Sequence, residues 1–210
     1  MLISLASYFR KIELESFFGS SFAEDTLPEP HYNQRPGHSL VTVSSGNSSG
    51  DLELSEMRWG VEDRTDKGAG SAVERIKPDE DPLSRPGSSP CVVPVNGFYM
   101  WKNGDIKDQP FFVRMMNLPF MPVAAVARQG SLQLLLTSAN TLVAPMSEVM
   151  PLVLPADLAL NWIKKEAPLT ELADRADKAF SITDFTVLKV SKKVSDPSNN
   201  RPDLIQPLPK

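Results

Sequence analysis

Apolar residues in the second half of the chain recur in short runs and alternating stretches, the pattern of β-strands. Residues 97–102 alternate before Asn103-Gly104, a dipeptide typical of a hairpin turn, and residues 111–115 provide the returning strand. Further runs of strand length lie at 91–93, 122–127, 132–137 and 185–190. The sequence therefore predicts a β-rich region from residue 91 onwards.

The first half of the chain predicts one helix and one hairpin. Apolar residues in 8–18 approximate a single helical face, and Gly19 is a typical helix end. Residues 39–44 and 52–58 alternate weakly on either side of a stretch of Ser, Gly and Asn. This composition favours a flexible connection between two paired strands.

Two more helices are expected near the C-terminus. Pro155 and Asp157 suit the first turn of a helix that extends to Lys165, because the helix dipole favours an acid there and a base at the other end. Residues 170–179 have a weaker helical pattern.

The remaining segments are polar or rich in proline. Residues 62–90 show no period and predict an irregular loop, and residues 202–210 form a Pro-rich tail. We find no internal repeat. The pattern predicts a single α+β domain over residues 1–210, with a mixed or antiparallel sheet core and a few flanking helices.

Composition narrows the functional classes. One cysteine among 210 residues excludes an intrachain disulfide and a cysteine-based zinc site, and two histidines offer little for a metal. The net charge of −4 argues against bulk electrostatic binding of nucleic acid, though not against a local basic groove. Because no apolar stretch approaches the roughly 18 residues of a membrane span, we expect a cytoplasmic protein without a membrane partner.

Generic catalytic motifs are absent: there is no GxGxxG, P-loop, HExxH or GxSxG, and we expect no cofactor and no metal. Cys91 lies in an apolar strand, where burial would raise its pKa and make it inert. His31 and His38 are more typical of a surface than of a site.

Seven segments together resemble one protein family. They are Tyr32-Asn33 with Pro36-Gly37, Arg58-Trp59-Gly60-Val61, Val95–Lys102, Gln109–Phe112, Leu136–Asn140, Met150–Leu154 and Asn200–Pro207. In this order they resemble the SRAP family, the SOS response-associated peptidases that process abasic sites in single-stranded DNA. The resemblance implies an SRAP-like fold and a role in the DNA damage response.

The resemblance also shows that the chemistry of the family is missing here. The family uses a cysteine directly after the initiator methionine, whose amine and thiol trap the sugar aldehyde as a thiazolidine; this chain has Leu2 there. Met100 stands at the position of the acid-base glutamate, and Ser147 at that of the histidine. Neither side chain replaces a general acid or base near neutral pH.

A further pair of positions is altered as well. In the best register, Ser71 and Val73 replace the Asn and Arg that hold the sugar and phosphate, although Arg75 could partly replace the arginine. Because the Gly, Pro, Trp and apolar positions of the scaffold persist, we expect a degenerate, non-catalytic relative, a pseudoenzyme.

Three functional hypotheses follow. The leading one is a protein that at most binds single-stranded or abasic-site DNA weakly; its candidate contacts are Arg58, Trp59, Arg75, Asn33, Pro36 and Trp101, with a basic tail cluster at Lys189, Lys192, Lys193 and Arg201. For the two tryptophans, core packing is the favoured interpretation and base stacking is the alternative. The alternatives are a protein-interaction or regulatory module, and an active cross-linking enzyme with unusual residues.

Overall fold

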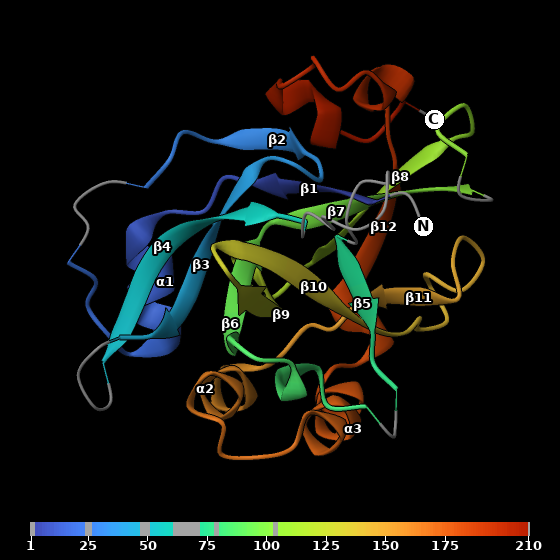
Figure 1. Cartoon of the computed structure of the whole chain (residues 1–210). Coiled ribbons are helices and arrows are strands. Elements are labelled where there is room, and N and C mark those ends of the chain that lie inside the picture. The colour runs from blue at the N-terminus through green and yellow to red at the C-terminus, as the bar shows by residue number, and fades with distance from the viewer. Residues whose placement is uncertain are drawn as a thin grey trace.

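The computed structural model describes residues 3–23, 27–46, 51–60, 72–77, 80–102 and 105–209. Two β-sheets lie against each other, and helices cover one end of the second sheet (Figure 1). The α+β class with antiparallel and mixed sheets is therefore confirmed.

Among the described residues, the first sheet has five antiparallel strands in the order β12-β8-β7-β1-β2. Their bounds are β1 Ile3–Ser7, β2 His31–Gln34, β7 Gly97–Trp101, β8 Pro110–Met115 and β12 Phe185–Lys189. The predicted strands at 97–102, 111–115 and 185–190 all lie here, while the turn at Asn103-Gly104 lies outside the described residues.

The second sheet is mixed, because β10 pairs in parallel with β4 and β5 and antiparallel with β9 and β11. Its strands are β3 Ser39–Ser45, β4 Leu52–Trp59, β5 Val73–Arg75, β6 Ser88–Val95, β9 Met121–Arg128, β10 Ser131–Ser138 and β11 Val149–Pro151. Pairing continues from β9 through β10, β4, β3 and β6 back to β9, so this sheet curls into a closed ring.

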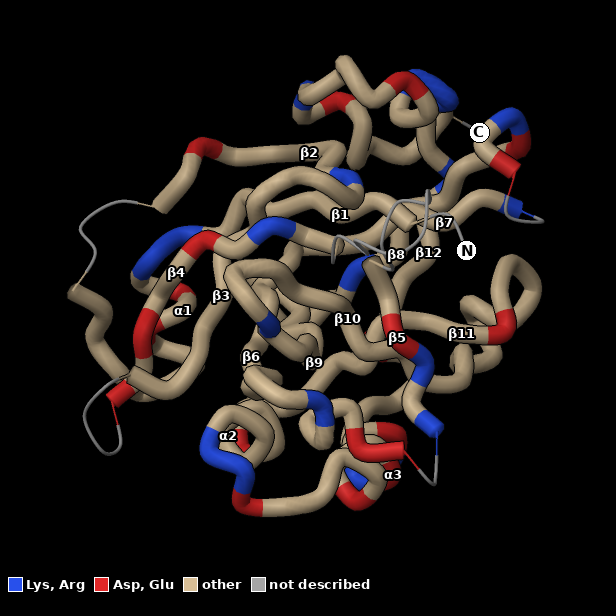
Figure 2. The backbone as a smooth tube through the Cα atoms, viewed as in Figure 1, with Lys and Arg blue, Asp and Glu red and all other residues tan. Residues whose placement is uncertain are grey.

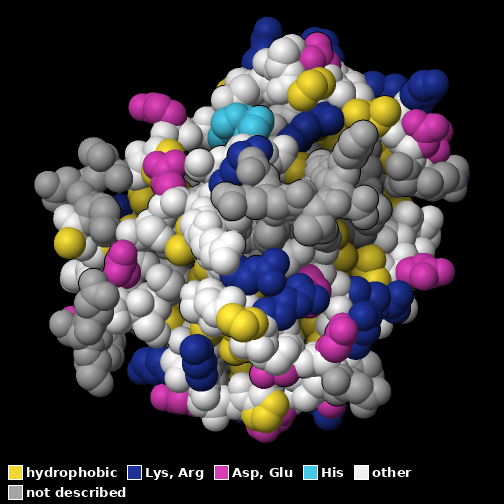
Figure 3. All heavy atoms as spheres, in the orientation of Figure 1, with side chains coloured by type: hydrophobic (Ala, Val, Ile, Leu, Met, Phe, Trp, Pro, Cys, Tyr) yellow, Lys and Arg dark blue, Asp and Glu magenta, His cyan; other side chains and the backbone are white. Residues whose placement is uncertain are grey.

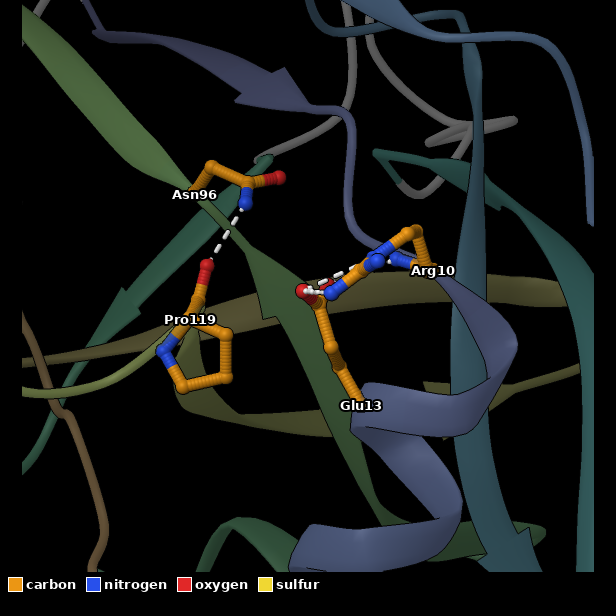
Figure 4. A network of polar contacts seen from close by, with 4 residues as sticks. All are labelled: Arg10, Glu13, Asn96 and Pro119. Carbon is orange, nitrogen blue, oxygen red and sulfur yellow. Dashed lines mark hydrogen bonds and ion pairs between the residues drawn. The ribbon is translucent and has the colours of Figure 1, made fainter.

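In the described part of the chain, three α-helices accompany the sheets: α1 Lys11–Phe18, α2 Ala156–Lys164 and α3 Leu169–Ala179. At the start of α1, the Arg10 backbone N–H and its guanidinium donate to the Glu13 carboxylate at 2.7–3.0 Å (Figure 4). Gly19 ends the helix with a φ of +62°, as its position predicts. Short 3₁₀-helices lie at Pro82–Ser84 (η1), Ile182–Asp184 (η3), Lys192–Ser195 (η4) and Pro202–Ile205 (η5).

The segment expected to be an irregular loop is more ordered than its composition suggests. Of residues 62–90, the described part contains β5, η1 and the beginning of β6. Strand β5 is short and polar, and it exists because β10 supplies its hydrogen-bonding partner rather than because of a period in its own sequence.

The largest of three apolar clusters among the described residues lies between the two sheets. This inter-sheet cluster includes Ile3, Leu5, Leu40, Trp59, Phe98, Met100, Val113, Val123, Leu134, Val143 and Met150. A second cluster lies beneath the helices and contains Trp162, and a third lies between the outer face of the first sheet and the C-terminal segment 190–209. Within the described residues, no helix is long and apolar enough to cross a bilayer.

Candidate functional site

Met100 marks the centre of the candidate site. It lies in β7 directly opposite Ile3 of β1, and its side chain is 1% exposed within the inter-sheet cluster. The position that the resemblance assigns to an acid-base glutamate therefore holds a buried thioether, which cannot transfer a proton. Leu2 and Ser71 lie outside the described residues.

Val73 approaches the same cluster from the second sheet. It pairs with Leu134 in the parallel β5–β10 ladder and packs, partly buried, against the inter-sheet cluster. An isopropyl group there adds apolar surface and offers no donor to a phosphate. Arg75, two residues on, is exposed and pairs with Leu136.

The Ser147 hydroxyl forms hydrogen bonds with the backbone two residues further along the chain. Its Oγ donates to the Val149 carbonyl at 2.8 Å and accepts from the Val149 N–H at 3.2 Å, and its own N–H donates to the Val143 carbonyl at 3.1 Å. The hydroxyl thus shapes the turn that leads into β11. It has no titration near neutral pH with which to replace an imidazole.

Asn33, one of the predicted DNA contacts, is fully buried and joins three parts of the chain. Its Oδ1 accepts from the Ser4 hydroxyl at 2.7 Å, and its Nδ2 lies 3.0–3.1 Å from the carbonyls of Val194, Asp196 and Asn199. The side chain therefore fixes the C-terminal segment onto β1 and β2.

The two tryptophans of the predicted interface also belong to the interior. Trp59 is 0% exposed and its indole N–H donates to the Ala72 carbonyl at 2.8 Å; Trp101 is 1% exposed and donates to the Ser195 hydroxyl at 3.0 Å. Burial confirms the core-packing interpretation of Trp59 and Trp101. We correct the alternative expectation that Asn33, Trp59 and Trp101 contact DNA, because packing leaves these side chains no open surface.

Two residues that the sequence analysis did not single out, Arg35 and Asn96, also hold distant parts of the chain together. Arg35 donates to the Val194 and Ser195 carbonyls and lies 5.8 Å from the centre of the Trp101 ring. Asn96 donates to the Pro119 carbonyl at 2.7 Å (Figure 4) and accepts from the Tyr8 N–H. Both lie inside segments that carry the family resemblance, and their roles depend on contacts between distant parts of the chain.

The surviving basic candidates lie on one face. Arg58 is exposed at the end of β4, and Ser131, the first residue of β10, pairs with Arg58 on one side and with Arg128 of β9 on the other. Pro36 is exposed in the turn that precedes β3, where the Gly37 N–H donates to the Trp59 carbonyl. Figure 2 shows basic positions along β4, β9 and β5, and Figure 3 shows basic side chains in the middle of this face.

Cys91 and the two histidines behave as structural residues. Burial raises the pKa of the Cys91 thiol to about 12, so the thiol stays protonated at neutral pH, as expected. The His31 and His38 rings meet edge to face at 5.1 Å, and each Nδ1 accepts a backbone N–H. Among the described residues, no three potential metal ligands gather together.

Comparison with known proteins identifies this architecture. A sequence profile described as SOS response associated peptidase (SRAP) matches residues 4–197. The chain belongs to the SRAP family. Its relatives include the abasic site processing protein YoqW of Bacillus subtilis, 22% identical over 92% of this chain and 93% of that protein, and the abasic site processing protein YedK of Escherichia coli, 24% identical over 86% and 87%.

Solved structures show the same SRAP fold. A protein from Bacteroides thetaiotaomicron superposes with a TM-score of 0.71 at 14% identity, covering 99% of this chain and all of that one. A phage-related protein from Bordetella bronchiseptica gives 0.66 at 17% identity, covering 90% and 94%. The SRAP chain described here thus keeps the whole fold at low sequence identity.

Proposed function

We propose that this SRAP protein is a non-catalytic relative of the abasic site processing proteins, which binds single-stranded DNA reversibly and does not cross-link to it. The observation that carries the proposal is the burial of Met100, at the position of the family's acid-base glutamate, opposite Ile3 in an apolar ladder. A buried thioether beside an isoleucine provides no group to protonate or deprotonate a ring-opened sugar.

Two further positions of the candidate site also support a loss of catalytic activity. Val73 presents a partly buried apolar side chain, and the Ser147 hydroxyl is occupied by the Val149 backbone. Replacement of several polar positions by apolar or locally bonded ones favours a site that has lost its chemistry while its packing is retained.

Reversible DNA binding is supported by basic side chains at the surface, of which Arg58 and Arg75 are exposed and Arg128 is half-buried. Arg58 and Arg128 flank Ser131 at one end of β10, and Arg75 pairs with Leu136 near the other end. Arginines at two places along β10 suit contacts with separate phosphates of a single strand, whereas the overall net charge of −4 keeps the affinity modest. The curated relatives are named for processing abasic sites in DNA, which makes this polymer the natural ligand to test.

The test is a gel shift of the full chain with a single-stranded oligonucleotide at low and raised salt. We expect a shift at micromolar protein that weakens steeply with salt, because binding releases counterions. The Arg58→Ala variant should bind more weakly and show a smaller salt slope. The absence of any shift at low salt would remove DNA binding from the proposal.

A further inference from the structure

A continuous groove runs along helix α3 on the side that faces the second sheet. One hollow of about 260 Å³ lies between α3 and β11, and a second of about 550 Å³ lies between α3 and β5. The two share Thr137, Ser138 and Ala173, so they join into what we call the α3 groove. Ala173 and Ala176, one helical turn apart, line it with methyl groups only, which leaves the space open.

One end of the α3 groove is apolar and exposed. Phe180, Phe185 and Met150 line this end together with Ile182, which is 42% exposed. Phe180 is partly buried, so Ile182 is the side chain that this end presents most openly. An exposed apolar side chain at an open, apolar hollow is typical of a protein-binding surface.

The other end of the groove carries two basic side chains and one acidic side chain, Asp174. Arg75 and Lys77 line the second hollow, with the hydroxyl-bearing residues Thr137 and Ser138 between them and the apolar end. Lys77 pairs at 2.7 Å with Glu80, but both side chains are more than half exposed, and such a pair is weak and easily exchanged.

We propose that the α3 groove binds an extended peptide from a partner protein, with a bulky apolar side chain at the Ile182 end and an acidic residue at the Arg75 end.

The charge of the groove favours a peptide over a nucleic acid as the ligand. A DNA strand carries a negative charge on every nucleotide, whereas Asp174 and Asp177 line the helical wall and would repel phosphates along the groove. A peptide with a single acidic residue places one negative charge beside Arg75 and Lys77, so Asp174 repels it less than a strand that carries a phosphate on every nucleotide. Arg75 is also a contact in the proposed DNA binding, so Ile182 and Ala173, which have no part in that proposal, test the peptide groove separately.

The test is a selection of twelve-residue peptides from a random displayed library against the full chain. We expect enriched sequences that combine a bulky apolar residue with an acidic residue a few positions away. Their affinity, measured by fluorescence anisotropy, should fall at least tenfold in Ile182→Glu and in Ala173→Arg, which fills the groove, and severalfold in Arg75→Glu. Ile12→Glu, on the exposed face of α1, is the matched control and should leave the affinity unchanged.

Several outcomes would overturn the inference. Failure to enrich any peptide, or enrichment of peptides indifferent to both Ile182→Glu and Ala173→Arg, would show that the groove is not the binding surface. Weakened oligonucleotide binding in folded Ile182→Glu would assign the groove to DNA instead. Circular dichroism of each variant separates loss of binding from loss of folding.

Discussion

Met100 of β7 and Ile3 of β1 are direct partners across an antiparallel ladder, and both side chains are buried in the inter-sheet cluster. This pairing joins residue 100, to which the family resemblance assigns a glutamate, to the beginning of the described chain. An ionised carboxylate at residue 100 would have to leave water and enter an apolar interior, which is costly without a partner. The packing of this chain therefore favours an apolar side chain at residue 100.

The first prediction concerns Met100→Glu. We expect it to lower the free energy of unfolding by about 3 kcal/mol or more at neutral pH, because an unpaired charge becomes buried. Met100→Leu, which keeps the volume and the apolar character, should cost less than about 1.5 kcal/mol. Urea unfolding measures both. Equal stability of the glutamate variant and the wild type would show that this position is open to water.

Asn33→Ala tests the attachment of the C-terminal segment. The substitution removes the donor that approaches the Val194, Asp196 and Asn199 carbonyls and the acceptor of the Ser4 hydroxyl. We expect a loss of about 2–3 kcal/mol in unfolding free energy, together with faster proteolysis within residues 190–209. Asn117→Ala, which removes one exposed bond to Asp184, is the control and should change little. Unaltered proteolysis in Asn33→Ala would contradict this role.

The histidine pair predicts a pH dependence of stability. Burial, and secondly the proximity of His38, lower the pKa of His31 below its usual value near 6.5. The folded state therefore favours the neutral ring, so this contribution is complete above about pH 6.5 and is lost as the pH falls through the folded pKa. The melting temperature should drop between pH 7 and 5, and His31→Gln should make this slope shallower. An equal change of melting temperature with pH in the wild type and in His31→Gln would contradict the role given to His31.

Trp101→Ala and Arg58→Ala should separate folding from DNA binding. Trp101 is enclosed, so its truncation is expected to cost about 3–5 kcal/mol in unfolding free energy. Arg58 is exposed, so Arg58→Ala should change the free energy of unfolding by less than about 0.5 kcal/mol. It should reduce by about 1 the slope of the logarithm of the oligonucleotide binding constant against the logarithm of the salt concentration. Titration calorimetry and thermal melts provide both readouts. A stable Trp101→Ala variant with weakened DNA binding would reverse the roles given to these residues.

Local signals predicted those parts of the fold that depend on neighbouring residues. Gly19 ends α1, and Pro155 precedes α2, as their conformational preferences require. The hairpin of β3 and β4 also follows from its alternation and its Ser- and Gly-rich connection. In contrast, β2 is a polar strand, His-Tyr-Asn-Gln, whose pairing with β1 no local pattern reveals.

The family resemblance placed candidate positions along the sequence, and these stay predictions: Met100 and Ser147 from the ordered motifs, and Val73 from the best register of its segment. The surroundings of the predicted DNA contacts could not be predicted from the sequence. The burial of Asn33 and Trp101 depends on the C-terminal segment, which packs over the first sheet and contacts them through Val194 and Ser195, more than 90 residues along the chain. The pairing of Ser131 with both Arg58 and Arg128 likewise depends on a parallel strand pair that joins distant parts of the sequence.

Incubation with single-stranded DNA that carries one abasic site, followed by denaturing electrophoresis, tests the central claim most directly. The account predicts that the full chain shows no covalent band, and that Leu2→Cys alone restores no stable cross-link, because Val73, Met100 and Ser147 do not supply the missing groups. A heat-stable protein–DNA band from the unaltered chain would contradict the account.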